Sequence, residues 1–256
     1  MWTKWHFYTI PLTFIVLIAL AIFIAWLLKD KSEKVRRLPF QIMAVVMLLF
    51  EVAKQIYNVD ENGYNLYALP FHYCSLFLYV YPLFAFYKGK YKQTVDTVAF
   101  CCGASLFFFM LVMPAVVYSE TNIQECFKTF DSFHTVVFHS YACFYFFLMV
   151  AMGGFKMNVK HDLKVIAVFF GGYVVVATAM SYLFETNFHN LLQCNLAPIE
   201  NIRLAIVESM GWAGQALYIA ILFVLTIALA MVAYFAVHGL LILVDKIRKK
   251  ITEKNA

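Results

Sequence analysis

The sequence has few charged side chains and no segment that resembles a soluble domain. Only 14% of its residues are Asp, Glu, Lys or Arg, whereas 63% are hydrophobic and the mean hydropathy is +0.75. This polar content is too small to cover a water-exposed surface. Internal repeats are absent, as are linkers rich in glycine, serine or proline. These absences predict a single integral membrane domain over residues 1–256.

Several motifs that would indicate a cofactor or a nucleotide are also missing. The sequence contains no G-x-x-x-x-G-K-[ST] or G-x-G-x-x-G phosphate loop. Residues 211–244 contain no lysine, which excludes a retinal Schiff base there. His72 and Cys74 are two positions apart and His134 and His139 are five apart, so neither pair shares a helix face. We therefore expect no metal site, no cofactor and no nucleic-acid partner.

Long apolar windows fill nearly the whole chain. About 20 apolar residues are needed to cross the hydrocarbon core as a helix. The sequence has seven such windows, at 7–28, 39–57, 68–87, 94–118, 134–152, 163–184 and 211–244. The first has no cleavage site after it and is read as a retained anchor. We predict an all-α bundle of seven transmembrane helices.

Basic residues are concentrated in every second connection. Sixteen of the twenty Lys and Arg residues lie in the loops 29–38, 88–92 and 153–164 and in the tail 245–254. Because basic residues remain on the cytoplasmic side, the N-terminus is predicted outside and the C-terminus in the cytoplasm. The tail is explained by topology alone, and the cell membrane is the expected location.

Polar residues inside the predicted spans gather near the outer surface. At 1.5 Å per residue, Cys74 and His139 lie at similar depths, roughly 6 to 9 Å below the outer end of their helices. Glu51 and Lys54 reach the same layer from the second helix, whereas the inner half carries little beyond Asp96 and Thr97. Ionisable residues within a membrane usually mark a functional site. The other residues assigned to this outer pocket are His72, His134, Ser181 and Asn187.

A thiol and an imidazole at one depth suit acyl transfer. Cys74 would attack an ester carbonyl and hold the acyl group as a thioester, with His139 as general base. Each residue also has a structural interpretation: most membrane cysteines are small packing residues, a lone histidine is usually hydrogen-bonded in the core, and Glu51 with Lys54 is most simply a buried ion pair.

Three segments resemble a known family. "LPFHYCSLFLY", "FHSYACFYFFL" and "ETNFHNLLQCNLAP" are similar to motifs of the bacterial YwaF-type integral membrane proteins and their eukaryotic relative, transmembrane protein 164. In the eukaryotic branch the resemblance implies a cysteine-dependent phospholipid acyltransferase. That role would fall on Cys74 with His139.

The leading hypothesis is a phospholipid or lysophospholipid acyltransferase, or a lipid esterase, that acts on membrane lipid in the outer leaflet. The alternative is a small-molecule transporter or ligand-sensing protein in which the same residues line an outward-facing cavity. The paired broken helices of a transporter are not evident. The predicted outer loops contain Cys126 and Cys194, and a disulfide between them remains open at this stage.

Overall fold

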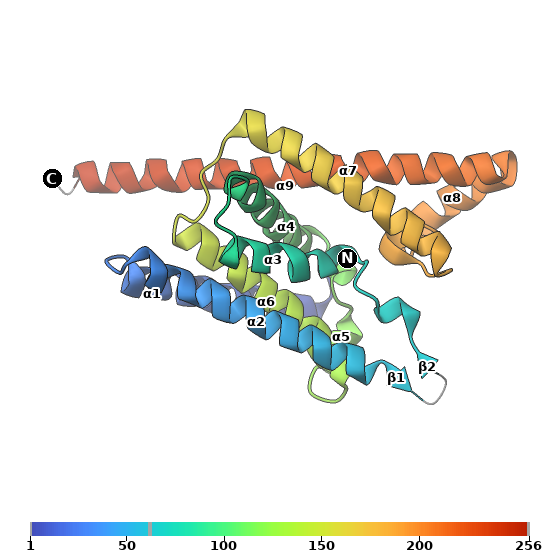
Figure 1. Ribbon diagram of the computed structural model, residues 1–256, viewed down its shortest axis with the longest axis horizontal. Coiled ribbons are helices and arrows are strands. Elements are labelled where there is room, and N and C mark those ends of the chain that lie inside the picture. Colours follow the sequence, from blue (N-terminus) through green and yellow to red (C-terminus); the bar gives the residue numbers. More distant parts are fainter. Residues whose placement is uncertain (1, 61–62, 255–256) are drawn as a thin grey trace.

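The computed structural model describes residues 2–60 and 63–254 and is built almost entirely of helices (Figure 1). The described residues contain six helices that are long and apolar enough to cross a membrane. They are α1 (Lys4–Leu28), α2 (Glu33–Tyr57), α4 (Lys92–Val112), α6 (Phe130–Ala151), α7 (Val159–Leu183) and α9 (Trp212–Lys254). The all-α, multi-span architecture is therefore confirmed, with one addition: a hairpin of two short strands, β1 (Val59–Asp60) and β2 (Gly63–Tyr64).

Local sequence explains where these helices begin and end. The predicted span 94–118 stops at Val112 as an α-helix, because Pro114 disfavours helical geometry in the residue before it. Thr129 and Asn158 cap α6 and α7, each accepting a hydrogen bond from the backbone three residues on. These two helices therefore start about four residues earlier than hydropathy alone predicts.

The predicted third span, 68–87, is the largest departure. A continuous helix runs only over Tyr73–Phe86, with a 3₁₀ turn η2 (Tyr73–Leu76) leading into α3 (Phe77–Phe86). Before it, a separate 3₁₀ turn η1 (Leu66–Ala68) is followed by extended backbone at Leu69 and His72. Pro70 favours this extension because it restricts the residue before it. Fourteen helical residues measure about 21 Å, less than the hydrocarbon core, so the count of seven spans stays a prediction.

Two connections expected to be irregular contain helices. After the 3₁₀ turn η3 (Pro114–Val116), the chain forms the short helix α5 (Glu120–Gln124). After η4 (Phe188–Asn190), it forms α8 (Ala197–Met210), which folds back along the first part of α9 (Figure 1). Gly211 has a positive φ of 60° at this bend. A Cβ on Gly214 would lie 2.4 Å from the Ile206 carbonyl oxygen, so the close approach of α8 and α9 requires glycine.

An aromatic core fixes α3 against α6. The rings of Tyr81 and Tyr145 stack with centroids 4.0 Å apart. Tyr81 donates to the Ala142 carbonyl at 3.1 Å, and Tyr145 donates to the Tyr81 carbonyl at 3.0 Å. Cys74 precedes Tyr81 by seven positions, and His139 precedes Ala142 by three. With both helices running in the same direction (Figure 1), Cys74 lies about one helical turn beyond His139, rather than at equal depth.

Candidate functional site

Cys74 lies in the first turn of the helix Tyr73–Phe86, with His72 as its N-cap residue. The thiol is half-buried, and no backbone carbonyl of the described residues accepts a hydrogen bond from the N–H of Tyr73 or Cys74. Unpaired N–H groups at a helix start point away from the helix and favour negative charge.

His72 has a structural role in this turn. Its Nε2 donates to the Tyr67 carbonyl at 2.9 Å, and its ring lies 4.4 Å from the Tyr67 ring and 5.2 Å from that of Phe188. The imidazole is thus held by Tyr67 and Phe188. The expectation that His72 faces away from Cys74 assumed a regular α-helix, and the extended backbone at His72 removes that assumption.

Glu51 and Lys54 form the predicted ion pair, and the pair belongs to a larger network. The Lys54 ammonium donates to Glu51 Oε1 at 3.3 Å, and the Gln55 amide donates to the same oxygen. Gln55 also donates to the Ala68 carbonyl at 3.0 Å and accepts from the Tyr64 hydroxyl. This network connects the end of α2 to the segment that leads into Cys74.

Lys54 is the common electrostatic neighbour of the site. Its charge acts on four groups that lie on two other segments: His72 and Cys74 in the turn before α3, and His134 and His139 on α6. The structure therefore brings the predicted residues of α2, α6 and the turn at Cys74 into one layer. No hydrogen bond joins Cys74 to His139 within the described part of the chain, as expected from their difference in depth.

His139 is buried and hydrogen-bonded through one ring nitrogen. It is 7% exposed, and its Nδ1 donates to the Thr135 carbonyl at 2.6 Å, because a carbonyl oxygen only accepts. The neutral ring then carries its lone pair on Nε2, the nitrogen that would take a proton. Tyr118 lies beside it, at a ring distance of 6.4 Å.

Ser181 and Asn187 hold the loop that follows α7. Ser181 Oγ accepts from the Phe188 N–H at 3.2 Å and is fully buried. Asn187 Oδ1 accepts from the N–H groups of Leu192 and Gln193, and its Nδ2 donates to the Gln193 carbonyl at 3.0 Å. Both side chains are committed to backbone groups, so their main contribution is to shape the loop.

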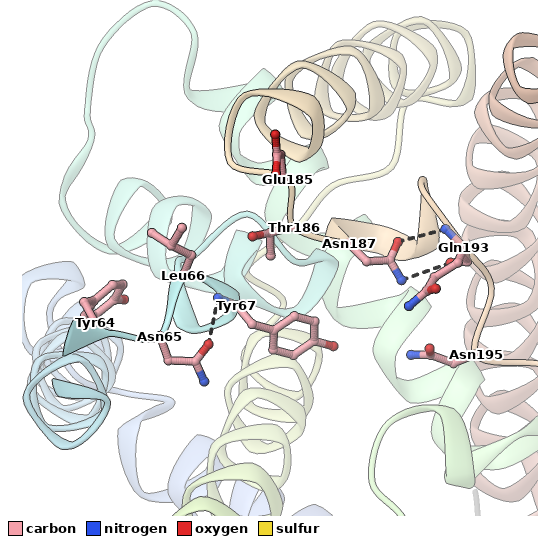
Figure 2. Close-up of a pocket in the computed structure, with 9 residues that line it drawn as sticks. All are labelled: Tyr64, Asn65, Leu66, Tyr67, Glu185, Thr186, Asn187, Gln193 and Asn195. Carbon is pink, nitrogen blue, oxygen red and sulfur yellow. Dashed lines mark hydrogen bonds between the residues drawn. The ribbon is translucent and has the colours of Figure 1, made fainter. Parts of the chain in front are cut away.

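A polar cavity of about 640 Å³ opens beside this loop (Figure 2). Its walls come from the segment before Cys74 and from the loop after α7. The lining residues are Tyr64, Asn65, Leu66, Tyr67, Glu185, Thr186, Asn187, Gln193 and Asn195. Tyr67 links the cavity to the thiol: burial raises the pKa of its phenol, and the nearby Cys74 raises it further. The sequence analysis missed Tyr67, since a tyrosine at the start of an apolar run carries no distinguishing signal.

The structure also describes the two loop cysteines and the side chains that could bind a metal ion. Cys126 and Cys194 are free thiols; Cys126 acts electrostatically on Tyr118, and Cys194 on Tyr218. Among residues 2–60 and 63–254, no group of three His, Cys, Asp or Glu side chains could hold a metal ion.

These features define a multi-pass helical membrane protein with a polar layer near one end of its bundle. The chain belongs to the TMEM164 family, whose model matches residues 1–235, and this confirms the family that the three sequence segments indicated. No curated protein and no solved structure shows significant similarity to the chain.

Proposed function

We propose that the protein is a phospholipid or lysophospholipid acyltransferase, or a lipid esterase, in which Cys74 is the nucleophile and His139 the general base. The observation that carries this proposal is the position of Cys74: a half-buried thiol in the first turn of a helix, beside backbone N–H groups that have no carbonyl acceptor, and near Tyr67 in the wall of a polar cavity. A cavity of this kind can admit a lipid head group while the acyl chain stays in the membrane.

In the proposed reaction, His139 Nε2 takes the proton of the Cys74 thiol, and the thiolate attacks the ester carbon. The oxyanion that forms accepts hydrogen bonds from the N–H groups of Tyr73 and Cys74. The C–O bond then breaks, and the alcohol leaves with the proton from His139. A second alcohol, or water, gives its proton to His139 and attacks the thioester, and the Cys74 thiol is regenerated.

The offset between Cys74 and His139 is compatible with this role. Catalytic hydrogen bonds are often long in the free enzyme and shorten when substrate is bound. A lipid ester placed between the two residues would be close to the sulfur on one side and to the imidazole on the other. Glu51 and Lys54 would set the charge of the layer, and His72 would position the turn.

We also propose the full topology: seven spans, the N-terminus outside, the C-terminus in the cytoplasm, and the cell membrane as the location. The exposed positions Thr121 and Lys88 test the orientation in a Cys74→Ala background. A cysteine at Thr121 should react with a membrane-impermeant maleimide in intact cells, and one at Lys88 should not. The opposite labelling pattern would place the site in the cytoplasmic leaflet.

The decisive test of the chemistry is a covalent intermediate. A radiolabelled acyl chain should stay on the protein after rapid quenching, should be released by neutral hydroxylamine, and should be missing from Cys74→Ala. Cys101→Ala, at a fully buried thiol on α4, is the matched control and should retain the label. Labelling that persists in Cys74→Ala would contradict the proposal. The alternative of a ligand-sensing protein is favoured if lipid binds the cavity without turnover.

A further inference from the structure

The contact between α2 and α6 contains polar groups to which the proposed reaction assigns no direct chemical step. Aromatic pairs join the two helices: Tyr57 lies 4.7 Å from Phe130, and Phe50 lies 5.5 Å from His134, measured between ring centroids. Lys54 follows Phe50 by one turn of α2. Lys54 and His134 therefore face the same seam, and the charge of Lys54 acts on His134.

His134 has a buried polar atom with no partner. Its side chain is 7% exposed and is stacked between Phe50 and Phe138, with interplanar angles of 22° and 17°. Nε2 is buried and forms no hydrogen bond with any described residue. Buried nitrogen atoms are nearly always hydrogen-bonded, so an orphaned one in a polar layer points to a missing ligand.

The Lys54 ammonium group offers further N–H donors at the same place. An ammonium group carries three N–H donors, and the bond to Glu51 at 3.3 Å is one interaction of that group. Glu51 Oε1 is shared with the Gln55 amide. Glu51 is also the acidic side chain next to Lys54, and the ion pair leaves the site close to neutral. An added anion would therefore meet donors rather than an excess of negative charge.

We propose that Lys54 and His134 form a subsite for the phosphate of a glycerophospholipid. This inference rests on the proposed function, because it names the part of the substrate bound beside the reacting ester. His134 precedes His139 by five residues, so it lies about 7.5 Å further out along α6 than the proposed base, and about 2 Å further out than Cys74, which lies one helical turn beyond His139. The phosphate of a phospholipid likewise lies outside its ester, separated by the glycerol backbone. Charge-assisted hydrogen bonds from a partly buried ammonium and imidazole suit a monoanionic phosphodiester.

The test is a binding measurement that needs no chemistry at Cys74. The full-length protein, in a phosphate-free detergent, is titrated with 1-alkyl-glycero-3-phosphomethanol and with the matched 1-alkyl-glycerol; neither has a carboxylic ester. The wild type should prefer the phosphate-containing lipid by about tenfold or more. His134→Phe keeps the aromatic stack and should lose the preference, as should the charge-neutral double variant Glu51→Gln/Lys54→Met. His238→Phe, a histidine of α9 beside Tyr234, is the matched control and should keep it.

Two results would overturn the subsite. One is equal binding of the two lipids by the wild type, whether or not inorganic phosphate also binds. The other is a preference that survives in both the His134→Phe and the double variant. Failure of the proposed function would give a different result. Cys74→Ala should keep the lipid preference, because binding needs no thiol. A wild type that shows this preference but never forms an acyl-thioester would support the subsite and contradict the proposed reaction.

Discussion

Two regions of the helix bundle differ in how their buried ionisable side chains are hydrogen-bonded. At the end with the basic loops, the fully buried carboxylate of Asp162 accepts four hydrogen bonds, from the Asn158 N–H, Thr97, His161 and Tyr234, at 2.7 to 3.0 Å. At the other end, the buried Nε2 of His134 has no hydrogen-bond partner among the described residues. A satisfied group stabilises the fold, whereas an unsatisfied one can bind something else.

This difference indicates which polar residues of a membrane protein are candidates for a functional role. Asp162 joins α7 to α4 through Thr97 and to α9 through Tyr234, so its charge is explained by structure. The residues around Lys54 are only partly explained in this way. Four experiments distinguish a polar residue that stabilises the fold from one that is available for function. They are given in order of decreasing expected effect.

Cys74→Ala should abolish lipid turnover while the midpoint of thermal unfolding in detergent stays close to that of the wild type. The replacement removes a sulfur atom but little volume, and the proposed mechanism has no other nucleophile. Turnover is measured on purified protein, with Cys101→Ala as the control. Wild-type turnover in Cys74→Ala would make the thiol a lining residue of the cavity.

His139→Ala should lower the rate by about 10²- to 10⁴-fold, the usual contribution of a positioned base. Raising the pH should restore part of the rate, because a larger fraction of the thiol then ionises unaided. The pH–rate profile of the variant is the measurement that separates a base from a packing residue. A uniform loss at every pH would assign His139 a structural role.

Asp162→Asn should have the reverse effect: reduced stability and normal activity per folded molecule. The amide would direct N–H donors at other donors, which costs about 1 to 3 kcal/mol for each group left unpaired. Denaturant or thermal unfolding measures the loss, and Tyr234→Phe, which removes a single donor, should show a smaller one. A selective loss of turnover without a change in stability would contradict the structural reading of this end.

The smallest effect concerns the helical hairpin of α8 and α9. Hydrogen bonds from Arg203 lower the pKa of Glu200 to about 2, with a further bond from the Cys194 N–H. A carboxyl whose folded pKa lies below its ordinary value of 4.5 stabilises the fold above that pH. Its contribution should therefore be lost as the pH falls from about 4.5 to 2.

Amide hydrogen exchange of residues 194–215 measures this loss of stability and should become faster as the pH falls. In Glu200→Gln, the exchange should change little over the same pH range. Equal acid sensitivity in wild type and variant would assign the effect to other carboxyl groups.

The class of protein and most of the spans could be predicted from the sequence alone. Hydropathy is local, so α1, α2, α6, α7 and α9 could be located from runs of apolar residues. The family could be recognised from three short segments. The unexpected buried charge, Asp162, was missed because it lies at the start of α7, where a carboxylate is ordinarily a first-turn residue in solvent.

The partners that each polar side chain meets depend on the tertiary structure. The extended backbone before Cys74, the folding of α8 onto α9 and the offset between Cys74 and His139 depend on contacts such as Gly214 with Ile206 and Tyr81 with Ala142. Asn187 and Ser181 differ from His134 in that their partners are backbone groups of the same loop. A polar side chain becomes structural or available according to the partners that meet it, and those partners are brought together only when distant segments pack.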